Sequence, residues 1–510
     1  MPNYLSPGVY MEEVSSGSRP IEGVGTAVAA FVGFAETGPV NEPVLVTNWT
    51  QFTQTFGGFI ENAFLAHAVY GYFLNGGGAA YVVRVGGTGP APDGRPAVAT
   101  AQLPAAIDGR PPLVLRALDN GANGGDAITV EVGEPSEPGE DVFKLTVRAG
   151  GQQEVFDNLT SKRGPSNVAT ALRASTLISV EETKGTALAT PRLGAKAVLS
   201  GERLPAPVTV SPEEYVGDAA ERTGFAGLEA VDNITMLCVP DLMTAHQRGL
   251  LDDDGLKAVQ LAMIAHCELM SDRVAILDPP PGLKPQKLKD WRQNIAGYDS
   301  KYATLYWPWL KIMDPRSGKP IMVPPSGHVA GIWARNDDSR GVHKAPANEV
   351  IRGAIDLEFG LTRGEHDQLN PIGVNCVRAF PGQGIRIWGA RTLSSDPEWR
   401  YLNVRRLFNF VEKSILNGTN WVVFEPNDQF LWAAVRRTIN AFLRRVWRSG
   451  ALFGQTPEQA FYVKVDEENN PEENRDAGIL TVDVGIAPVK PAEFVVFRLS
   501  QFSEGAALEE

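Results

Sequence analysis

Cysteine is scarce in this chain of 510 residues, and the three that occur lie far apart and in apolar surroundings. Cys238, Cys267 and Cys376 form no C-x-x-C pair, so neither a disulfide framework nor a zinc site is expected. The six histidines show no H-x-H or H-E-x-x-H spacing, and we expect no bound metal. Buried thiols in a reducing compartment fit best, which predicts synthesis in a cytoplasm.

Long apolar runs, a secretory leader and an excess of positive charge are also missing. No stretch approaches the length of a membrane span, and the opening MPNYLSPGVYMEEV lacks the basic and apolar regions of a signal peptide. We therefore expect no membrane insertion. The formal net charge of −13 argues against direct nucleic-acid binding, because such proteins are usually basic.

Glycine-rich segments are present, but none has the order that a phosphate site needs. LNGGGAAY (residues 74–81) follows a predicted helix and precedes a predicted strand, which is typical of a helix cap. PRSGKP (315–320) lacks the first glycine of a P-loop, and GQGIRIWG (382–389) lacks the third glycine of G-x-G-x-x-G. The acidic clusters DDDG (252–255) and NDD (336–338) are interpreted as solvated or helix-capping charges. We expect no catalytic residues and no cofactor.

The length predicts roughly three or four domains, and helix–strand alternation indicates an α/β fold, α+β overall. The α/β domain is expected over residues 21–86 and 213–373. Its predicted elements are strands at 26–35, 42–49, 80–86, 273–278 and 301–309, and helices at 61–75, 255–270 and 287–298. Residues 87–212 are rich in Gly, Pro and short strand-like runs, which predicts an inserted β-rich domain.

A separate C-terminal domain is predicted for residues 374–487. Helices are expected at 402–416 and 430–448, with a strand at 419–426 (TNWVVFEP) between them. In the second helix the apolar residues fall on one arc and five arginines on the other. These are Arg436, Arg437, Arg444, Arg445 and Arg448. The arginine arc is either a solvated helix face or a docking face for an acidic partner.

Residues 493–502 near the end of the chain predict a strand with two apolar faces, because Phe494 and Val496 alternate with Val495, Phe497 and Leu499. A strand of this kind belongs inside a covered sheet. The sequence alone does not say whether that sheet belongs to the same chain or to another molecule.

Several long segments of the chain resemble the contractile tail sheath family of contractile phage tails, R-type pyocins and extracellular injection systems. The matching segments are SPGVYMEEV (6–14), FLNGGGAAYVVRV (73–85), RGVHKAPAN (340–348), the region from Asn370 to Leu407, NWVVFEPND (420–428) and GIAPVKPAEFVVF (485–497). The resemblance covers residues 1–86 and 213–510. Val465 stands where the pattern often has Cys.

The resemblance implies that residues 1–20 and 488–510 are arms that add strands to neighbouring subunits. Val9, Tyr10 and Met11 would pair in the first arm, and Phe494, Val495, Val496, Phe497 and Leu499 in the second. SSGSRP (15–20) and GIAPVKP (485–491) would be flexible hinges. Residues 374–487 would face an inner tube, with the five arginines as the tube contact.

The implied function is that of a structural sheath subunit. It would polymerise as stacked hexameric rings around the tube and contract to drive the tube through a target envelope. Its partners would be copies of itself, the tube protein, and baseplate and cap proteins of a phage tail or a released tail-like particle. The alternatives are a nucleotide-dependent α/β enzyme and a different self-assembling shell protein.

Overall fold

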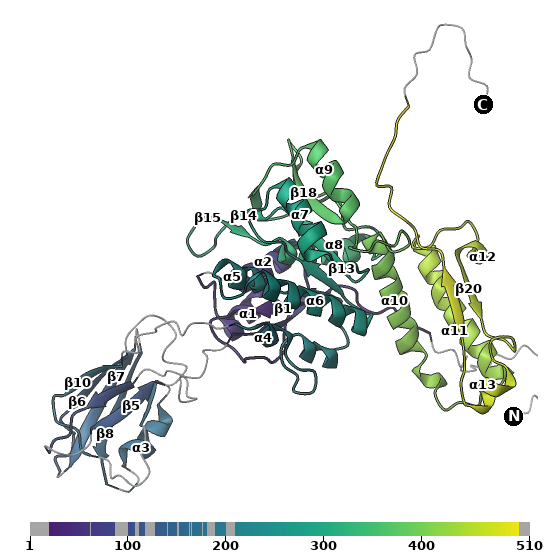
Figure 1. Ribbon diagram of the computed structural model, residues 1–510. Coiled ribbons are helices and arrows are strands. Elements are labelled where there is room, and N and C mark those ends of the chain that lie inside the picture. The colour runs from purple at the N-terminus through teal and green to yellow at the C-terminus, as the bar shows by residue number, and fades with distance from the viewer. Residues whose placement is uncertain are drawn as a thin grey trace, which may run out of the picture. The chain divides into compact units, whose positions relative to one another are not determined.

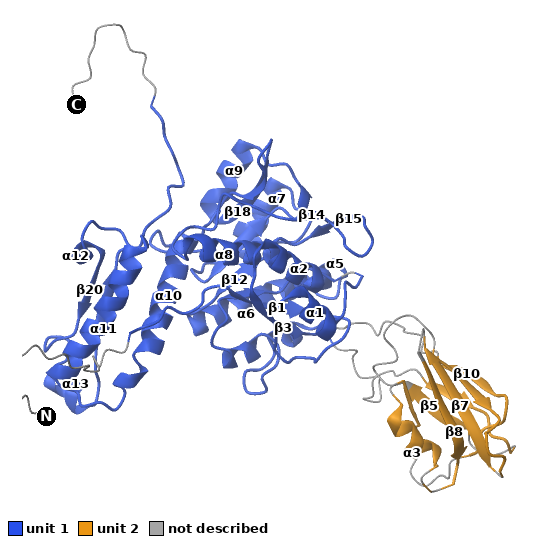
Figure 2. Ribbon diagram, turned by 180° about the vertical axis from the view of Figure 1, so that it is seen from behind, with its two compact units in different colours: residues 1–86, 210–510 blue, residues 87–209 orange. Residues whose placement is uncertain are grey.

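The computed structural model describes residues 20–498, except residues 62, 87–99, 108–111, 118–127, 140, 150–151, 163, 165, 176, 181–188 and 200–209. The chain divides into two compact units, one formed by residues 1–86 and 210–510 and the other by residues 87–209 (Figure 2). Some residues predicted to pair in the arms lie outside the described residues. They are Val9, Tyr10 and Met11 near the N-terminus and Leu499 near the C-terminus.

The first unit is built on a sheet of nine strands in the order β16-β19-β18-β13-β12-β11-β1-β3-β2 (Figure 1). The six strands from β18 to β3 run parallel, and antiparallel strands close both edges. Their bounds are β1 (Val28–Gly33), β2 (Val44–Val46), β3 (Ala79–Arg84), β11 (Met236–Cys238), β12 (Val274–Leu277), β13 (Ala303–Trp307), β16 (Glu349–Val350), β18 (Val374–Phe380) and β19 (Gly384–Ile387). The central strands β1, β11 and β12 are apolar throughout, which is typical of parallel strands that are covered on both faces.

Helices cover this sheet, and a small sheet of three strands lies at its border. The helices are α1 (Trp49–Phe56), α2 (Leu65–Asn75), α4 (Pro212–Val216), α5 (Asp241–Gln247), α6 (Asp253–Met270), α7 (Pro285–Asp290), α8 (Ser326–Arg340) and α9 (Arg363–Leu369). The small sheet has the order β15-β14-β17, with β14 (Leu310–Met313), β15 (Pro320–Val323) and β17 (Ala354–Leu357). Gly76 ends α2 in the left-handed conformation, which confirms the helix-cap interpretation of LNGGGAAY.

Helices α2 and α8 pack closely because glycines lie at their crossing. A Cβ atom at Gly327 would lie 2.4 Å from the Cα of Ala68, and one at Gly331 would lie 2.3 Å from the carbonyl oxygen of Tyr72. Both distances are shorter than any real Cβ contact, so only glycine fits. Together with α1 and one face of the sheet, the pair encloses the main core.

The C-terminal part of the first unit is a layer of helices and one hairpin. Its elements are α10 (Leu402–Gly418), α11 (Gln429–Arg448), α12 (Pro457–Ala460), β20 (Phe461–Lys464), α13 (Glu472–Asp476) and β21 (Asp483–Ile486). Strands β20 and β21 pair antiparallel, and α11 packs against β20. The layer has its own core, to which Ile21 from the start of the described chain contributes a fully buried side chain.

Two sequence predictions about this region are wrong. Val374 does not begin a separate domain, because β18 pairs in parallel with β13 inside the nine-stranded sheet. Residues 419–426 are not a strand: Asn420–Val422 form a 3-10 helix in the turn from α10 to α11. Val423 is 64% exposed and Phe424 is fully exposed at φ 69°, so the β-propensity of these residues is overridden by the need to reverse the chain.

The second unit consists of antiparallel sheets. One has the order β10-β6-β7-β8 and the other β4-β5-β9, and both contribute to a shared core. The elements are β4 (Thr100–Leu103), β5 (Leu113–Ala117), β6 (Ile128–Gly133), β7 (Val142–Ala149), β8 (Gln152–Thr160), α3 (Val168–Ala171), β9 (Ile178–Val180) and β10 (Lys196–Leu199).

Candidate subunit interface

Helix α11 carries a buried apolar face and an exposed basic face. Asp428 caps its first turn by accepting a hydrogen bond from the Leu431 backbone N–H at 2.8 Å. The buried residues are Leu431, Trp432, Val435, Ile439, Phe442, Leu443 and Val446. The exposed arginines are Arg436, Arg437, Arg444, Arg445 and Arg448, so the helical period places both groups of residues as the sequence predicts.

The arginines of this face are not equivalent. Arg445 donates a hydrogen bond to the carbonyl oxygen of Ile21, and its guanidinium lies over the Phe442 ring. It therefore ties the N-terminal segment to α11. Within the part of the chain that the structure describes, the other four form no ion pair. They remain available to an acidic partner.

The hairpin of β20 and β21 has two open edges. Each strand has one partner among the described residues, so each presents a row of backbone N–H and C=O groups on its outer side. Tyr462 on β20 is 62% exposed. Open edges of this kind accept an added strand.

The chain that follows β21 is held firmly, which corrects the interpretation of GIAPVKP as a flexible hinge. The Ala487 N–H donates to the Ala460 carbonyl at 2.8 Å, and the Phe453 N–H donates to the Ala487 carbonyl at 2.8 Å. The Val489 N–H donates to the Ala451 carbonyl at 3.2 Å. These backbone bonds fix residues 487–489 to their own subunit.

The fixed segment ends at Glu493, whose carboxylate lies in a cluster of donors. Arg391 donates from Nε at 2.8 Å and from Nη2 at 2.6 Å, while Asn370 Nδ2 lies at 2.8 Å and the Tyr401 hydroxyl at 3.2 Å. Burial alone would raise the pKa of Glu493, but the bonds from Arg391 and Asn370 outweigh it and hold that pKa below its usual value. We call this cluster the Glu493 clamp.

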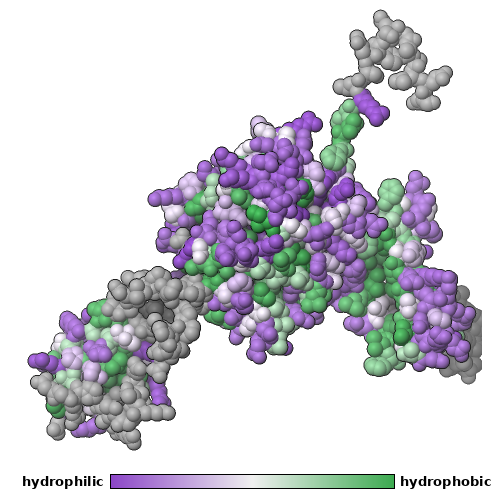
Figure 3. Space-filling model, in the orientation of Figure 1, coloured by the Kyte–Doolittle hydropathy of each residue, from purple (hydrophilic) through white to green (hydrophobic). Residues whose placement is uncertain are grey.

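Beyond the clamp the apolar side chains are exposed. Phe494, Val495, Val496 and Phe497 are 73%, 69%, 78% and 85% exposed, and no described residue pairs with this segment as a strand. Figure 3 shows the apolar residues at the base of the C-terminal arm standing clear of the folded body. Four consecutive large apolar side chains in water indicate a surface that is covered by a partner.

The N-terminal segment is anchored on the same layer. The Ile21 side chain lies against Gly418 at the end of α10, where a Cβ would be 2.6 Å from its Cγ1 atom. The Val24 N–H donates to the Ser414 hydroxyl of α10 at 3.1 Å. The bases of both predicted arms therefore lie on the C-terminal layer.

Helix α10 joins this layer to the large sheet through ion pairs. Arg406 forms a two-pronged pair with Asp337 of α8, at 2.9 and 2.6 Å, and both side chains are 3% exposed. Asp337 was interpreted from the sequence as a solvated or capping charge, and the structure shows it buried and paired. Its partner is distant in sequence, so no local pattern could reveal it.

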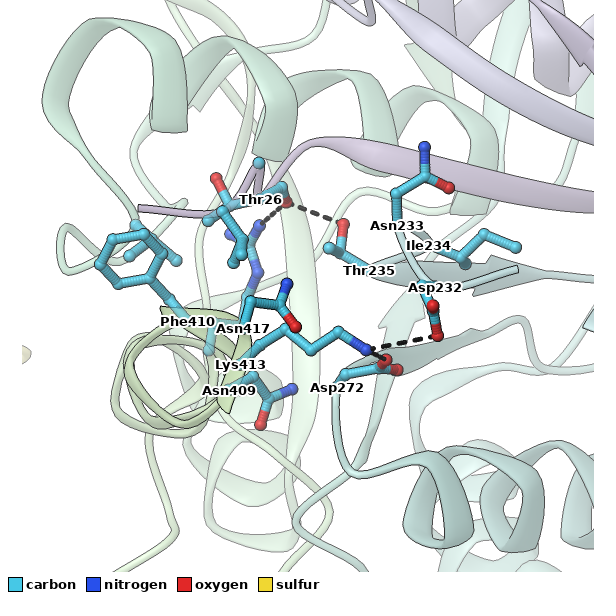
Figure 4. A pocket seen from close by; sticks show the side chains of 14 residues that line it. Thr26, Asp232, Asn233, Ile234, Thr235, Asp272, Asn409, Phe410, Lys413 and Asn417 are labelled. Carbon is cyan, nitrogen blue, oxygen red and sulfur yellow. Dashed lines mark hydrogen bonds and ion pairs between the residues drawn. The ribbon is translucent and has the colours of Figure 1, made fainter. Parts of the chain in front are cut away.

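A cavity of about 270 Å³ lies beside this junction. Lys413 reaches across it to Asp272 at 3.0 Å and to Asp232 at 3.7 Å, and Arg406 donates to the Thr26 carbonyl at 3.0 Å (Figure 4). Three segments that are far apart in the sequence thus meet on α10. We interpret the cavity as part of this junction, because its charged side chains already have ion-pair partners.

The carboxyl edge of the parallel strands, where α/β proteins bind ligands, is occupied by the chain's own carboxylates. Asp241 accepts backbone N–H bonds from Phe34 at 2.7 Å, from Leu65 at 3.1 Å and from Phe64. An anion at the first turn of α2 would require the same donors. Asp278 accepts the Ser326 N–H of α8 at 3.0 Å.

The described residues contain no group of three or more His, Cys, Asp or Glu side chains that could hold a metal ion. In the same residues, no helix combines the length and apolar character that a membrane span needs. The three cysteines are free and buried.

Comparison with known proteins identifies the fold as that of contractile sheath subunits. The chain superimposes on the sheath protein of an extracellular contractile injection system, the PVC sheath complex in its contracted state. The TM-score is 0.58 at 24% identity, covering 99% of each chain.

Sequence comparison gives the family. The model of the phage tail sheath protein central domain matches residues 226–393, and that of the phage tail sheath C-terminal domain matches residues 394–502. The tail sheath protein of Burkholderia phage BcepMu is 25% identical over 98% of both chains. The tail sheath protein of Vibrio phage KVP40 is 27% identical over 47% of this chain and 38% of its own length. The chain belongs to the phage tail sheath protein family.

Proposed function

We propose that the protein polymerises as stacked hexameric rings around an inner tube, and that the resulting sheath contracts to drive the tube through a target envelope. The observation that carries this proposal is the exposed segment from Phe494 to Phe497, which follows directly on the Glu493 clamp. The same subunit presents a hairpin with two open edges. One subunit thus carries both an exposed apolar segment and a place for a strand to add.

The energetics favour an array over a pair of subunits. Burying four large apolar side chains contributes roughly 6–12 kcal/mol before other terms. Ordering about ten residues costs a comparable amount. A single strand exchange is therefore close to neutral, and the links become stable when every subunit both gives and receives strands.

The basic face of α11 is proposed to contact the inner tube. Arg436, Arg437, Arg444 and Arg448 present four exposed positive charges on a chain whose net charge is −13. An acidic tube surface would pair with them in the extended sheath. Contraction would then replace these contacts by a tighter lateral packing of subunits, so the work comes from subunit packing rather than from a nucleotide.

The junction on α10 supports movement of the body of each subunit as one piece. The buried pair of Arg406 and Asp337 and the bonds of Lys413 join the C-terminal layer to the large sheet. The links to neighbouring subunits would then lie outside these bonds, beyond Glu493 and before Ile21. Baseplate and cap proteins complete the proposed partners, in a phage tail or in a tail-like particle released from the cell.

Electron microscopy of the full chain, alone and co-expressed with its tube protein, tests this function. We expect hollow ridged cylinders with six-fold end views, and longer, narrower cylinders where tube is present. Globular particles in both preparations would overturn the proposal.

A further inference from the structure

A basic groove of about 1020 Å³ lies where the chain leaves β21 and runs to the Glu493 clamp. Its wall includes the segment from Val489 to Val495, the end of α8 and the start of α9. Two carboxylates, Asp367 and Glu493, line it together with six cationic side chains. The cationic residues are Arg340, Lys344, Arg363, Arg378, Arg391 and Lys490.

Most of this positive charge is not neutralised by the subunit itself. Arg391 pairs with Glu493, and Lys344 pairs with Glu349 at 2.9 Å. The other four form no ion pair with any residue that the structure describes, and Asp367 is the one groove carboxylate left to offset them.

The two histidines of the groove add little charge at neutral pH. Burial, together with the nearby Arg378, lowers the pKa of His366, and burial with Arg340 lowers that of His343. Trp388, which is 38% exposed, adds a flat apolar surface. The groove therefore suits a flexible segment with several carboxylates and small apolar side chains.

The end of this chain has that composition. Residues 503–510 read SEGAALEE, with Glu504, Glu509 and Glu510 and no lysine or arginine. The family's C-terminal domain model ends at residue 502, so this segment lies beyond the matched region. At about 3.3 Å per residue, the twelve residues from Leu499 to Glu510 span up to ~40 Å.

We propose that the basic groove binds the acidic segment 503–510 of a neighbouring copy. This inference rests on the proposed function, because strand exchange by residues 494–497 carries the following residues onto that neighbour. The groove begins at Val489, three residues after the end of β21, which is one of the edges open to the incoming strand. The bound segment then forms an electrostatic contact between the two copies, in addition to the apolar contact made by residues 494–497. We call this electrostatic contact the acidic lock.

Peptide binding tests the groove directly. The full chain truncated after Phe502 is titrated against a labelled SEGAALEE peptide, and anisotropy is recorded at low and high salt. We expect binding that weakens about tenfold or more when Arg340→Glu and Arg363→Glu are combined, and that weakens as salt rises. The peptide SEGAALRR should bind the double variant better than it binds the unsubstituted groove. The inference is overturned if the SEGAALEE peptide does not bind at low salt, or if it binds the double variant and the unsubstituted protein with equal affinity.

Cross-linking tests whether the segment comes from another copy. Chains carrying R363C and chains carrying E509C are mixed, assembled and oxidised; the native thiols do not interfere because all three are buried. A disulfide-linked dimer of the two chains is expected. Cylinders without this dimer overturn the acidic lock while leaving strand exchange intact. A failure to form cylinders counts against the proposed function instead, and the peptide titration still decides whether the groove binds the acidic segment.

Tighter binding of a peptide from residues 9–16, with Glu12 and Glu13, would assign the groove to the other arm.

Discussion

Arg391 holds Glu493 with two hydrogen bonds, at 2.8 and 2.6 Å, and the next residue, Phe494, is already 73% exposed. The boundary between the folded subunit and its free arm is therefore a single residue wide. Tension on the arm would act on a charge-assisted, two-pronged bond, which is among the stronger polar contacts in proteins. The clamp fixes the point from which the arm must reach its neighbour.

The tight crossing of α2 and α8 predicts that Gly327→Ala destabilises the subunit. The added methyl group would lie 2.4 Å from the Ala68 Cα and force the helices apart, at a cost of about 2 kcal/mol. Thermal unfolding followed by circular dichroism measures this. Gly364→Ala is the matched control, because it lies in helix α9 with no atom near its Cβ position, and it should be neutral or mildly stabilising. Equal melting temperatures for both variants would contradict the packing argument.

The junction between α10 and α8 depends on a buried ion pair. Asp337→Asn leaves the Arg406 charge buried without its counter-ion, which should cost about 3 kcal/mol of unfolding free energy. The neighbouring Asp338→Asn removes the same charge from an exposed position and should change stability by less than about 0.5 kcal/mol. Denaturant unfolding of the two variants is the measurement. Similar midpoints would show that the junction does not depend on this pair.

Asp278 makes stability depend on pH. Burial raises its pKa to about 7, although the bonds from Ser326 act in the opposite direction. The folded state therefore binds a proton that the unfolded state has lost, and the contribution of Asp278 to stability falls as the pH rises from the unfolded pKa through 7. Relative to Asp278→Asn, the unsubstituted protein should lose about 2 kcal/mol between pH 5 and pH 8. The prediction would be contradicted if, between pH 5 and pH 8, the unfolding free energy of the unsubstituted protein relative to Asp278→Asn stayed constant or rose.

The basic face of α11 predicts a defect in tube binding without a defect in folding. Replacing Arg437, Arg444 and Arg448 by glutamate should prevent co-assembly with tube, because three attractive charges become repulsive. The control variant replaces Arg173, Arg192 and Arg248 by glutamate, which makes the same charge change at exposed positions outside α11. Co-sedimentation with tube protein measures tube binding, and circular dichroism shows whether each variant is folded. Normal co-assembly of the first variant would rule out the assigned tube contact.

The sequence predicts those parts of the fold that depend on local periodicity. The two faces of α11 follow from the spacing of its apolar residues, and the glycine cap at Gly76 follows from a run of glycines behind a helix. The strand expected at 419–426 failed because Val423 and Phe424 lie in a turn between two helices. Their β-propensity is a preference for packed surfaces, which this turn does not provide.

The candidate interface is less predictable, because its parts meet only in three dimensions. Arg391 and Glu493 are far apart in the chain, as are Arg406 and Asp337, and neither pair has a local pattern. The boundary at Val374 was misplaced for the same reason, since only the sheet order shows that β18 pairs with β13. The run from Phe494 to Phe497 is exposed and pairs with no described residue, so the strand that the sequence predicts there stays a prediction.

Negative-stain microscopy of the chain truncated after Glu493, beside the full chain, tests the central claim most directly. The truncation removes the exposed segment and keeps the Glu493 clamp and every contact of the folded body. The account predicts ordered cylinders from the full chain and soluble monomers from the truncated one. Ordered cylinders from the truncated chain would contradict strand exchange as the link between subunits.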